Sequence, residues 1–181
     1  MVSRRLRSLA LLLAHPGEDS LETVVALSQS EPWLQSAVHE LKGMPLELWQ
    51  AEHTRLFING YPGTLAPPFE SAYRHGQLYG AAAGELSDLY RQAGLGPSEA
   101  PPDYLGTELE FAAWLLETKD PSALLSVLWE EHLALWLPRF CSDLARGARL
   151  KLYVSLAHEL EQLASLFGER EGGELLGTAA S

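Results

Sequence analysis

Apolar side chains recur along most of the chain at intervals of three and four residues, the period of a helix that packs one face on a core. Near the start, Leu6, Leu9, Ala10 and Leu13 share one such face. Similar stripes recur within residues 105–116 and 152–163. Since no stretch alternates with a sustained period of two, a β-sheet is not expected. The pattern therefore predicts an all-α fold, a single helical bundle of about seven to nine helices.

Proline, glycine and capping residues set the expected ends of these helices. Pro32 and Pro45 suit first turns, Gly43 suits a helix end, and Pro138 is expected to kink or end the helix that contains it. We predict one helical domain over residues 1–168 and a flexible C-terminal tail over residues 169–181. The expected helices after the first run over about residues 20–28, 32–42, 45–57, 77–93, 103–118, 122–137 and 149–167.

Two segments rich in proline and glycine interrupt the helical pattern. We call residues 64–70, "TLAPPFE", the first connector and residues 94–104, "GLGPSEAPPDY", the second connector. A Pro-Pro pair restricts φ twice and removes two backbone donors, so each connector is expected to be extended and preorganised. Preorganisation reduces the entropy that is lost when a partner docks. The connectors are therefore the candidate docking elements.

Composition narrows the class of partner. The 181 residues include 13 Lys and Arg against 24 Asp and Glu, a formal net charge of −11. This balance argues against nucleic acid as the main partner, because phosphate binding needs a basic surface. No run approaches the length of a membrane span, and the short apolar run after Arg4, Arg5 and Arg7 is interpreted as helix rather than an export signal. A single cysteine, Cys141, indicates a reducing compartment, the cytoplasm.

The sequence offers no positive support for catalysis. A di-iron bundle would require Glu-x-x-His pairs, and none of the six histidines has an acid three positions before it. The zinc-protease pattern fails at His158-Glu159, and neither a dinucleotide fingerprint nor a P-loop is present. Cys141 lies in an apolar helical stripe and is expected to be a buried thiol. We therefore predict a protein that is not an enzyme and has no metal or cofactor.

The connectors place aromatic, aliphatic and acidic side chains near one another. Leu56, Phe57, Phe69 and Tyr73 are expected to form an apolar floor. Glu70, Asp103 at the end of the second connector and Glu108 just after it supply carboxylates. The surface therefore suits an apolar segment that carries arginine. Two other interpretations remain open: Asp103 serves only as a helix cap, and the aromatic rings serve only to seal the bundle.

Four motifs resemble one known family. "LF" at 56–57, "PPFESAY" at 67–73, "PDYLGTELEF" at 102–111 and "EHLALWLPRF" at 131–140 are similar, in order and spacing, to motifs of the TorD/DmsD/NarJ family of molybdoenzyme maturation chaperones. The likeness runs from about Leu9 to Phe167. Asp103-Tyr104 stands where the TorD/DmsD branch usually has Asp-His, which is closer to the nitrate reductase branch, whereas "PPFES" is closer to TorD.

The resemblance implies a helical, cytoplasmic chaperone that is not an enzyme. Such proteins bind the N-terminal region, often a twin-arginine signal, of a molybdopterin-containing catalytic subunit and hold it until its cofactor is inserted. The partner would be that subunit without its cofactor, and the chain would be a monomer or a domain-swapped dimer. The resemblance carries peptide contacts over to Leu56, Phe57, Pro67, Pro68, Phe69, Glu70, Tyr73, Asp103, Tyr104 and Glu108.

Two other classes of function stay open from the residues alone. One is a small helical enzyme that depends on a metal or ligand and has a pocket lined by carboxylates. The other is a structural helical subunit of a larger complex.

Overall fold

The computed structural model describes residues 2–60, 63–78, 80–118 and 122–168. Over these residues the chain forms nine continuous helices, two of them composed of more than one helix type, which confirms the predicted all-α bundle and its number of helices. The expected tail at residues 169–181 lies outside the described residues. None of the described helices is long and apolar enough to cross a bilayer.

The helices of the first third begin and end close to where the sequence predicts. Pro32 occupies the first turn of its helix and Gly43 follows the end of the same helix, as expected from their backbone preferences. Pro45 directly precedes the next one. The elements are α1 (Val2–Leu12), α2 (Ser20–Leu27), a 3₁₀ turn η1 (Pro32–Leu34) that continues into α3 (Gln35–Lys42), and α4 (Leu46–Phe57).

The middle of the chain differs from the prediction. A helix was expected over about residues 77–93, but α6 covers only Ala81–Gln92. Helix α5 (Glu70–His75) forms earlier, directly after the first connector, and ends at Gly76, whose φ of 70° suits glycine. The expectation of a uniformly extended first connector is wrong: Phe69 is extended (φ −134°, ψ 127°), but its N–H donates to the carbonyl of Pro67 at 2.9 Å, which makes a tight turn at Pro68, and Glu70 is already helical.

The predicted helix end at Pro138 is wrong. Helix α7 (Leu105–Glu117) is followed by α8 (Ser122–Val127), a π-helical stretch η2 (Leu128–Leu133) and α9 (Ala134–Gly147), and the last three are continuous. Pro138 lies inside α9 with its ring exposed. An internal proline costs about 3 kcal/mol, but the burial of Trp136, Leu137 and Phe140 around it offsets that cost. Helix α10 (Lys151–Gly168) then completes the fold.

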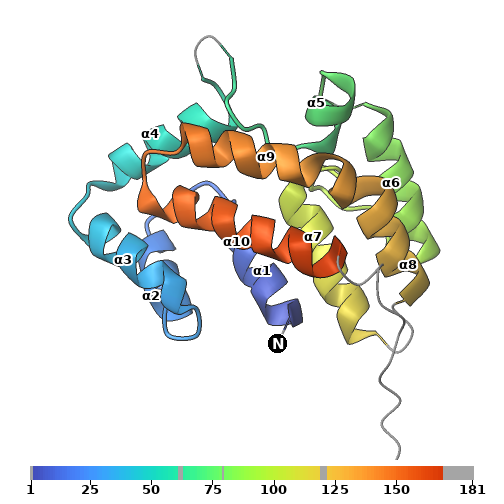
Figure 1. The fold of residues 1–181 in the computed structure, drawn as a ribbon, viewed down its shortest axis with the longest axis horizontal. Coiled ribbons are helices and arrows are strands. Elements are labelled where there is room, and N and C mark those ends of the chain that lie inside the picture. Colours follow the sequence, from blue (N-terminus) through green and yellow to red (C-terminus); the bar gives the residue numbers. More distant parts are fainter. Residues whose placement is uncertain (1, 61–62, 79, 119–121, 169–181) are drawn as a thin grey trace, which may run out of the picture.

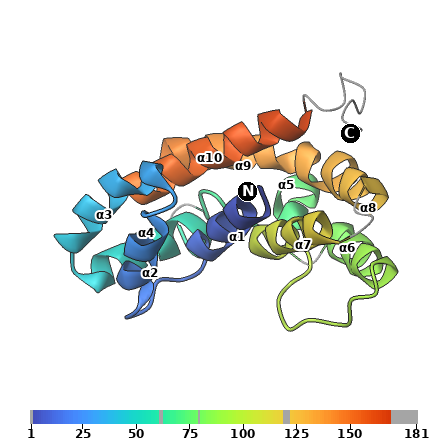
Figure 2. The ribbon, with the colours of Figure 1, turned by 90° about the horizontal axis from the view of Figure 1, so that it is seen from below.

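Helices α9 and α10 run side by side across the whole width of the molecule (Figures 1 and 2). Helices α2, α3 and α4 lie at one end and α5, α6 and α8 at the other, while α1 packs along α7. The core between them is apolar and largely leucine, and Trp49, Trp129 and Trp136 are buried in it, while Trp114 packs against it partly buried. The second connector is the long loop between α6 and α7, and it returns the chain to the first connector.

Candidate functional site

The two connectors meet at a short antiparallel contact, which we call the connector junction and define as residues 67–73 with 102–108. Phe69 and Tyr104 face each other as an isolated β-bridge. The backbone N–H of Glu70 donates to the carbonyl of Asp103 at 3.0 Å, and the N–H of Leu105 donates to the carbonyl of Pro68 at 2.9 Å. The structure therefore brings together two motifs that lie about 30 residues apart.

Asp103 caps a helix, but not the helix that follows it. Its Oδ2 accepts a hydrogen bond from the backbone N–H of Ser71, at 3.2 Å, in the first turn of α5. The residue at the N-cap of α5 is Phe69, which has no side-chain oxygen to satisfy these amides. Asp103 is 1% exposed, so this contact is sealed from water. The second connector thus completes the helix that starts at the end of the first connector.

Glu70 is fully buried and already has partners. Its carboxylate pairs with Arg74 one turn later on α5. The Nδ1 nitrogen of His132 lies 3.0 Å from Oε2 and 3.1 Å from Oε1 of Glu70. Because an ionised carboxylate only accepts hydrogen bonds, this nitrogen carries the proton in the contact. Glu70 therefore ties α5 to the π-helical stretch η2.

Glu108 is less well paired. It is fully buried on α7, and neither carboxyl oxygen makes a hydrogen bond of good geometry among the described residues, although the indole N–H of Trp136, itself without another partner, interacts with it weakly. Burial raises the pKa of Glu108 well above its ordinary value, and the nearby carboxylates of Glu70 and Asp103 raise it further. Trp136 and Arg74 oppose the shift to a smaller extent. Glu108 is therefore held as the neutral acid well above the pH at which an exposed glutamate ionises.

These three acids form a buried carboxyl cluster with Arg74 and His132. Since all three are at most 1% exposed, none is open to a side chain from outside in this conformation. Direct pairing of these carboxylates with an arginine of a partner requires an opening of the junction.

The apolar residues divide into a buried layer and an open layer. Leu56, Phe57 and Pro68 are buried, and the N–H of Ala66 donates to the carbonyl of Leu56 at 2.9 Å, which fixes the first connector to the end of α4. The partly exposed members of the predicted set are Pro67, Phe69, Tyr73 and Tyr104.

Contacts with buried residues hold the partly exposed rings of Phe69, Tyr73 and Tyr104 in place. The rings of Phe69 and Tyr104 lie 5.6 Å apart between centroids, and the Tyr104 hydroxyl donates to the carbonyl of Leu13 at 3.0 Å. Tyr73 packs on Trp136, and the guanidinium of Arg139 lies 5.6 Å from the Tyr73 ring centroid. A Cβ at Gly106 would lie 2.4 Å from the Tyr104 ring, so glycine is needed there for that ring to fit. Packing therefore presents these rings at fixed positions.

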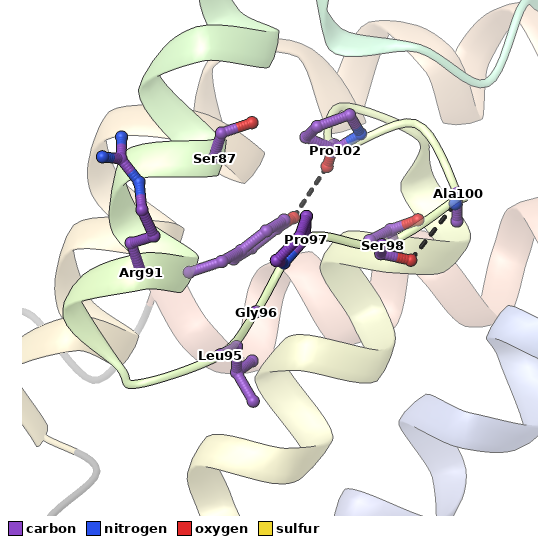
Figure 3. Close-up of a pocket in the computed structure, with 10 residues that line it drawn as sticks. Ser87, Arg91, Leu95, Gly96, Pro97, Ser98, Ala100 and Pro102 are labelled. Carbon is purple, nitrogen blue, oxygen red and sulfur yellow. Dashed lines mark hydrogen bonds between the residues drawn. The ribbon is translucent and has the colours of Figure 1, made fainter.

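A cleft of about 330 Å³ adjoins the second connector (Figure 3). It lies between α6, the loop that follows it and the start of α7, and the hydroxyl of Tyr90, one of its lining residues, donates a hydrogen bond to the carbonyl of Pro102 at 2.7 Å. The sequence did not predict these residues as a site, although the second connector supplies six of the ten lining residues. The lining residues are Ser87, Tyr90, Arg91, Leu95, Gly96, Pro97, Ser98, Ala100, Pro102 and Thr107.

Other chemistry finds no support in the described part of the chain. Over these residues no group of three or more His, Cys, Asp or Glu side chains is arranged to hold a metal ion. Cys141 is buried as expected, and burial raises the pKa of its thiol to about 12, so it is an unreactive core residue.

The fold and the junction define a helical protein with two proline-braced connectors joined over a buried carboxyl cluster. Residues 22–142 match the family described as nitrate reductase delta subunit, and because this is more than half of the chain, the protein belongs to that family. The family is the one to which the TorD/DmsD/NarJ resemblance points, so that resemblance is confirmed.

Two known proteins are similar to this chain. The chaperone protein YcdY of Escherichia coli is 28% identical over 109 residues, which is 59% of this chain and 56% of that protein, so the chain spans about half the length of this relative. The crystal structure of a putative redox enzyme maturation protein from Archaeoglobus fulgidus superposes with a TM-score of 0.69 and 25% identity, over 90% of this chain and 93% of the other.

Proposed function

We propose that this protein is a maturation chaperone that binds the N-terminal segment of the catalytic subunit of a molybdenum-dependent oxidoreductase. It acts in the cytoplasm, holds that subunit while the cofactor is inserted and releases it before export. Membership in the nitrate reductase delta subunit family supports this role, as do the names of the two similar proteins, a chaperone and a redox enzyme maturation protein.

The observation that carries the proposal is the open edge of the connector junction. Phe69, Tyr73 and Tyr104 are partly exposed aromatic rings that packing holds in fixed positions. Rigid aromatic surface binds partners at low entropic cost. An extended client segment would lie against these rings and Pro67, while Leu56, Phe57 and Pro68 form the layer beneath them.

The buried carboxyls favour a basic client. Glu70 and Asp103 are buried in the connector junction beside Glu108, which is held neutral there, and Glu70 pairs with Arg74 and contacts His132, in a chain whose net charge is −11. Such a field attracts arginine at the surface. When the junction opens, a client guanidinium would replace Arg74 at Glu70 and pair with Asp103 or Glu108.

Pull-down from the native cell tests the function. The tagged protein is expected to capture the catalytic subunit of a molybdenum oxidoreductase, identified by mass spectrometry. A Phe69→Ala variant should retain about one-thirtieth of the affinity, since removal of a central aromatic anchor costs about 2 kcal/mol. Trp33→Ala is the matched control, because Trp33 is also a partly buried aromatic but lies on η1 at the other end of the molecule.

Capture of no such subunit would overturn the function. If Phe69→Ala and wild type capture the subunit equally well, the connector junction is not the surface that binds it. A separate experiment tests the attraction of client arginines to the carboxylates. The affinity for a synthetic twin-arginine peptide should fall when its arginines are replaced by glutamine, and when salt is added.

A further inference from the structure

The cleft beside Tyr90 carries an inference that rests on the proposed function and deepens it. We infer that this cleft receives an apolar side chain of the same basic client segment, as a second contact next to the connector junction.

The first argument is the chemistry of the lining. Leu95, Pro97, Ala100, Pro102 and the ring of Tyr90 present apolar surface to the cleft. Its volume of about 330 Å³ lies at the lower end of the range for ligand sites in proteins, about 300–1,000 Å³. The cleft therefore suits one or two apolar side chains better than a large cofactor.

The second argument is that three of the four hydroxyl side chains that line the cleft, those of Ser87, Tyr90 and Ser98, already have hydrogen-bond partners. The Tyr90 hydroxyl donates to Pro102, the Ser87 hydroxyl donates to the carbonyl of Ala83 at 2.8 Å, and Ser98 Oγ accepts from the N–H of Ala100 at 3.1 Å. A polar ligand would have to break these bonds to gain its own. An apolar occupant leaves them intact.

The third argument is charge. Arg91 at the rim is neutralised by a salt bridge with Asp88. Glu99, exposed between two lining residues, has no salt bridge among the described residues. Behind the ring of Tyr90 lies the carboxyl cluster: burial raises the pKa of the Tyr90 hydroxyl, and Glu108, Glu70 and Asp103 raise it further. A positively charged neighbour of the apolar side chain is therefore favoured at the rim.

The fourth argument is continuity with the junction. Pro102 lines the cleft and directly precedes Asp103, which caps α5. The Tyr90–Pro102 hydrogen bond fixes the second connector from the cleft side. A segment bound across Tyr104 thus needs only a few residues to reach the cleft, at about 3.3 Å per residue when extended.

The test is a double-mutant cycle with synthetic peptides. The probes carry an arginine pair followed by four positions, with one leucine moved through these positions and alanine at the others; the reference peptide has alanine at all four. Wild type should bind the best leucine peptide about tenfold more tightly than the reference, as expected for burial of one leucine side chain. Affinity is measured by fluorescence anisotropy.

Two variants change the cleft in opposite directions. Ser87→Leu fills it and should abolish the leucine preference while the reference peptide binds as before. Leu95→Ala enlarges it and should shift the preference from leucine to phenylalanine. Ser165→Leu is the matched control for the first, because the Ser165 hydroxyl also bonds the carbonyl four residues earlier, on the exposed face of α10.

Three results would overturn the inference: no leucine preference in wild type, an unchanged preference in folded Ser87→Leu, or no shift toward phenylalanine in Leu95→Ala. If Ser87→Leu does not fold, the Leu95→Ala shift decides alone. Failure of the proposed function is separate, because it is read from capture of the subunit in the native cell. A protein that captures the subunit yet shows no leucine preference retains its function and lacks this second contact.

Discussion

At the scale of single residues, Glu108 is expected to lower the stability of the folded protein. A buried carboxyl group without a hydrogen bond of good geometry is costly to ionise, and two further carboxyls lie nearby. Polar groups in such positions occur preferentially where function requires them. Glutamine has nearly the same shape and no charge, so its effect isolates the charge.

We expect Glu108→Gln to raise the melting temperature at pH 8 and to change it little at pH 5. Because the folded-state pKa of Glu108 lies well above 4.5, the native state keeps a proton that the unfolded state has lost. Stability contributed by this group therefore falls as pH rises above about 4.5. Each 1 kcal/mol regained should raise the melting temperature by about 2–4 °C.

Thermal denaturation at both pH values, followed by circular dichroism, measures this effect. Glu161→Gln is the control, since Glu161 is exposed on α10 and should change little at either pH. A melting temperature of Glu108→Gln that falls equally at pH 5 and pH 8 would show that the carboxyl group is needed for its shape rather than penalised for its charge.

At the scale of elements, the cap of α5 joins two distant parts of the chain. Asp19 and Asp103 both precede helices in the sequence, yet Asp19 makes no side-chain cap bond. Asp103 caps α5, which precedes it by about 30 residues. This arrangement explains why the short α5 forms beside a connector, since a helix of six residues is not stable alone.

Asp103→Ala is expected to destabilise the protein by about 1–2 kcal/mol and to increase amide hydrogen exchange within residues 71–75, because the α5 amide loses its acceptor. Asp103→Asn keeps an acceptor oxygen and should restore most of the protection. Asp19→Ala, the matched control, should cost under about 0.5 kcal/mol. Unfolding in urea and exchange by mass spectrometry give the two readouts; unchanged exchange in Asp103→Ala would contradict the capping role.

The helices themselves could be predicted from the sequence because each follows from a local pattern. The stripe in α1 and the prolines before α3 and α4 act within one or two turns. Two features could not be predicted from the sequence: the formation of α5, and the continuation of α9 through Pro138. Both depend on tertiary contacts that outweigh local preference.

The membership of the binding site stays a prediction. The resemblance names both Phe69 and Tyr104 as contacts, and only the structure shows that they pair with each other. The burial of Glu70, Asp103 and Glu108 was not predictable, because acids are seldom buried and only the full fold shows their partners. Tyr90 also escaped notice, since a tyrosine in a helical stripe resembles any core residue.

At the scale of the whole molecule, a network around Glu52 joins elements that lie more than 90 residues apart in the sequence. Glu52 on α4 pairs with Arg55, and its Oε1 accepts the N–H of Arg149 at 2.7 Å. Arg55 donates to the carbonyl of Gly147 at 2.6 Å, at the turn between α9 and α10. These bonds hold the end of the long α9–α10 pair against α4, just before the first connector begins.

Glu52→Gln is expected to destabilise the protein at pH 7 by about 1–3 kcal/mol, because it removes or weakens the three charge-assisted hydrogen bonds that this mostly buried carboxylate accepts from Arg55 and Arg149. Burial raises the pKa of Glu52, but the hydrogen bonds from Arg55 and Arg149 outweigh it and the net shift is downward. Its contribution is therefore complete above pH 4.5 and lost as pH falls through the lowered pKa.

Urea denaturation measures this effect. The difference in the free energy of unfolding between wild type and Glu52→Gln should decrease from pH 7 to pH 3.5. Glu47→Gln is the control, since Glu47 is exposed on the same helix and its replacement should not change the free energy of unfolding at either pH. If this difference stays constant over the pH range, the loss of stability comes from altered packing. The charged network would then not be the interaction that holds α4 to the α9–α10 turn.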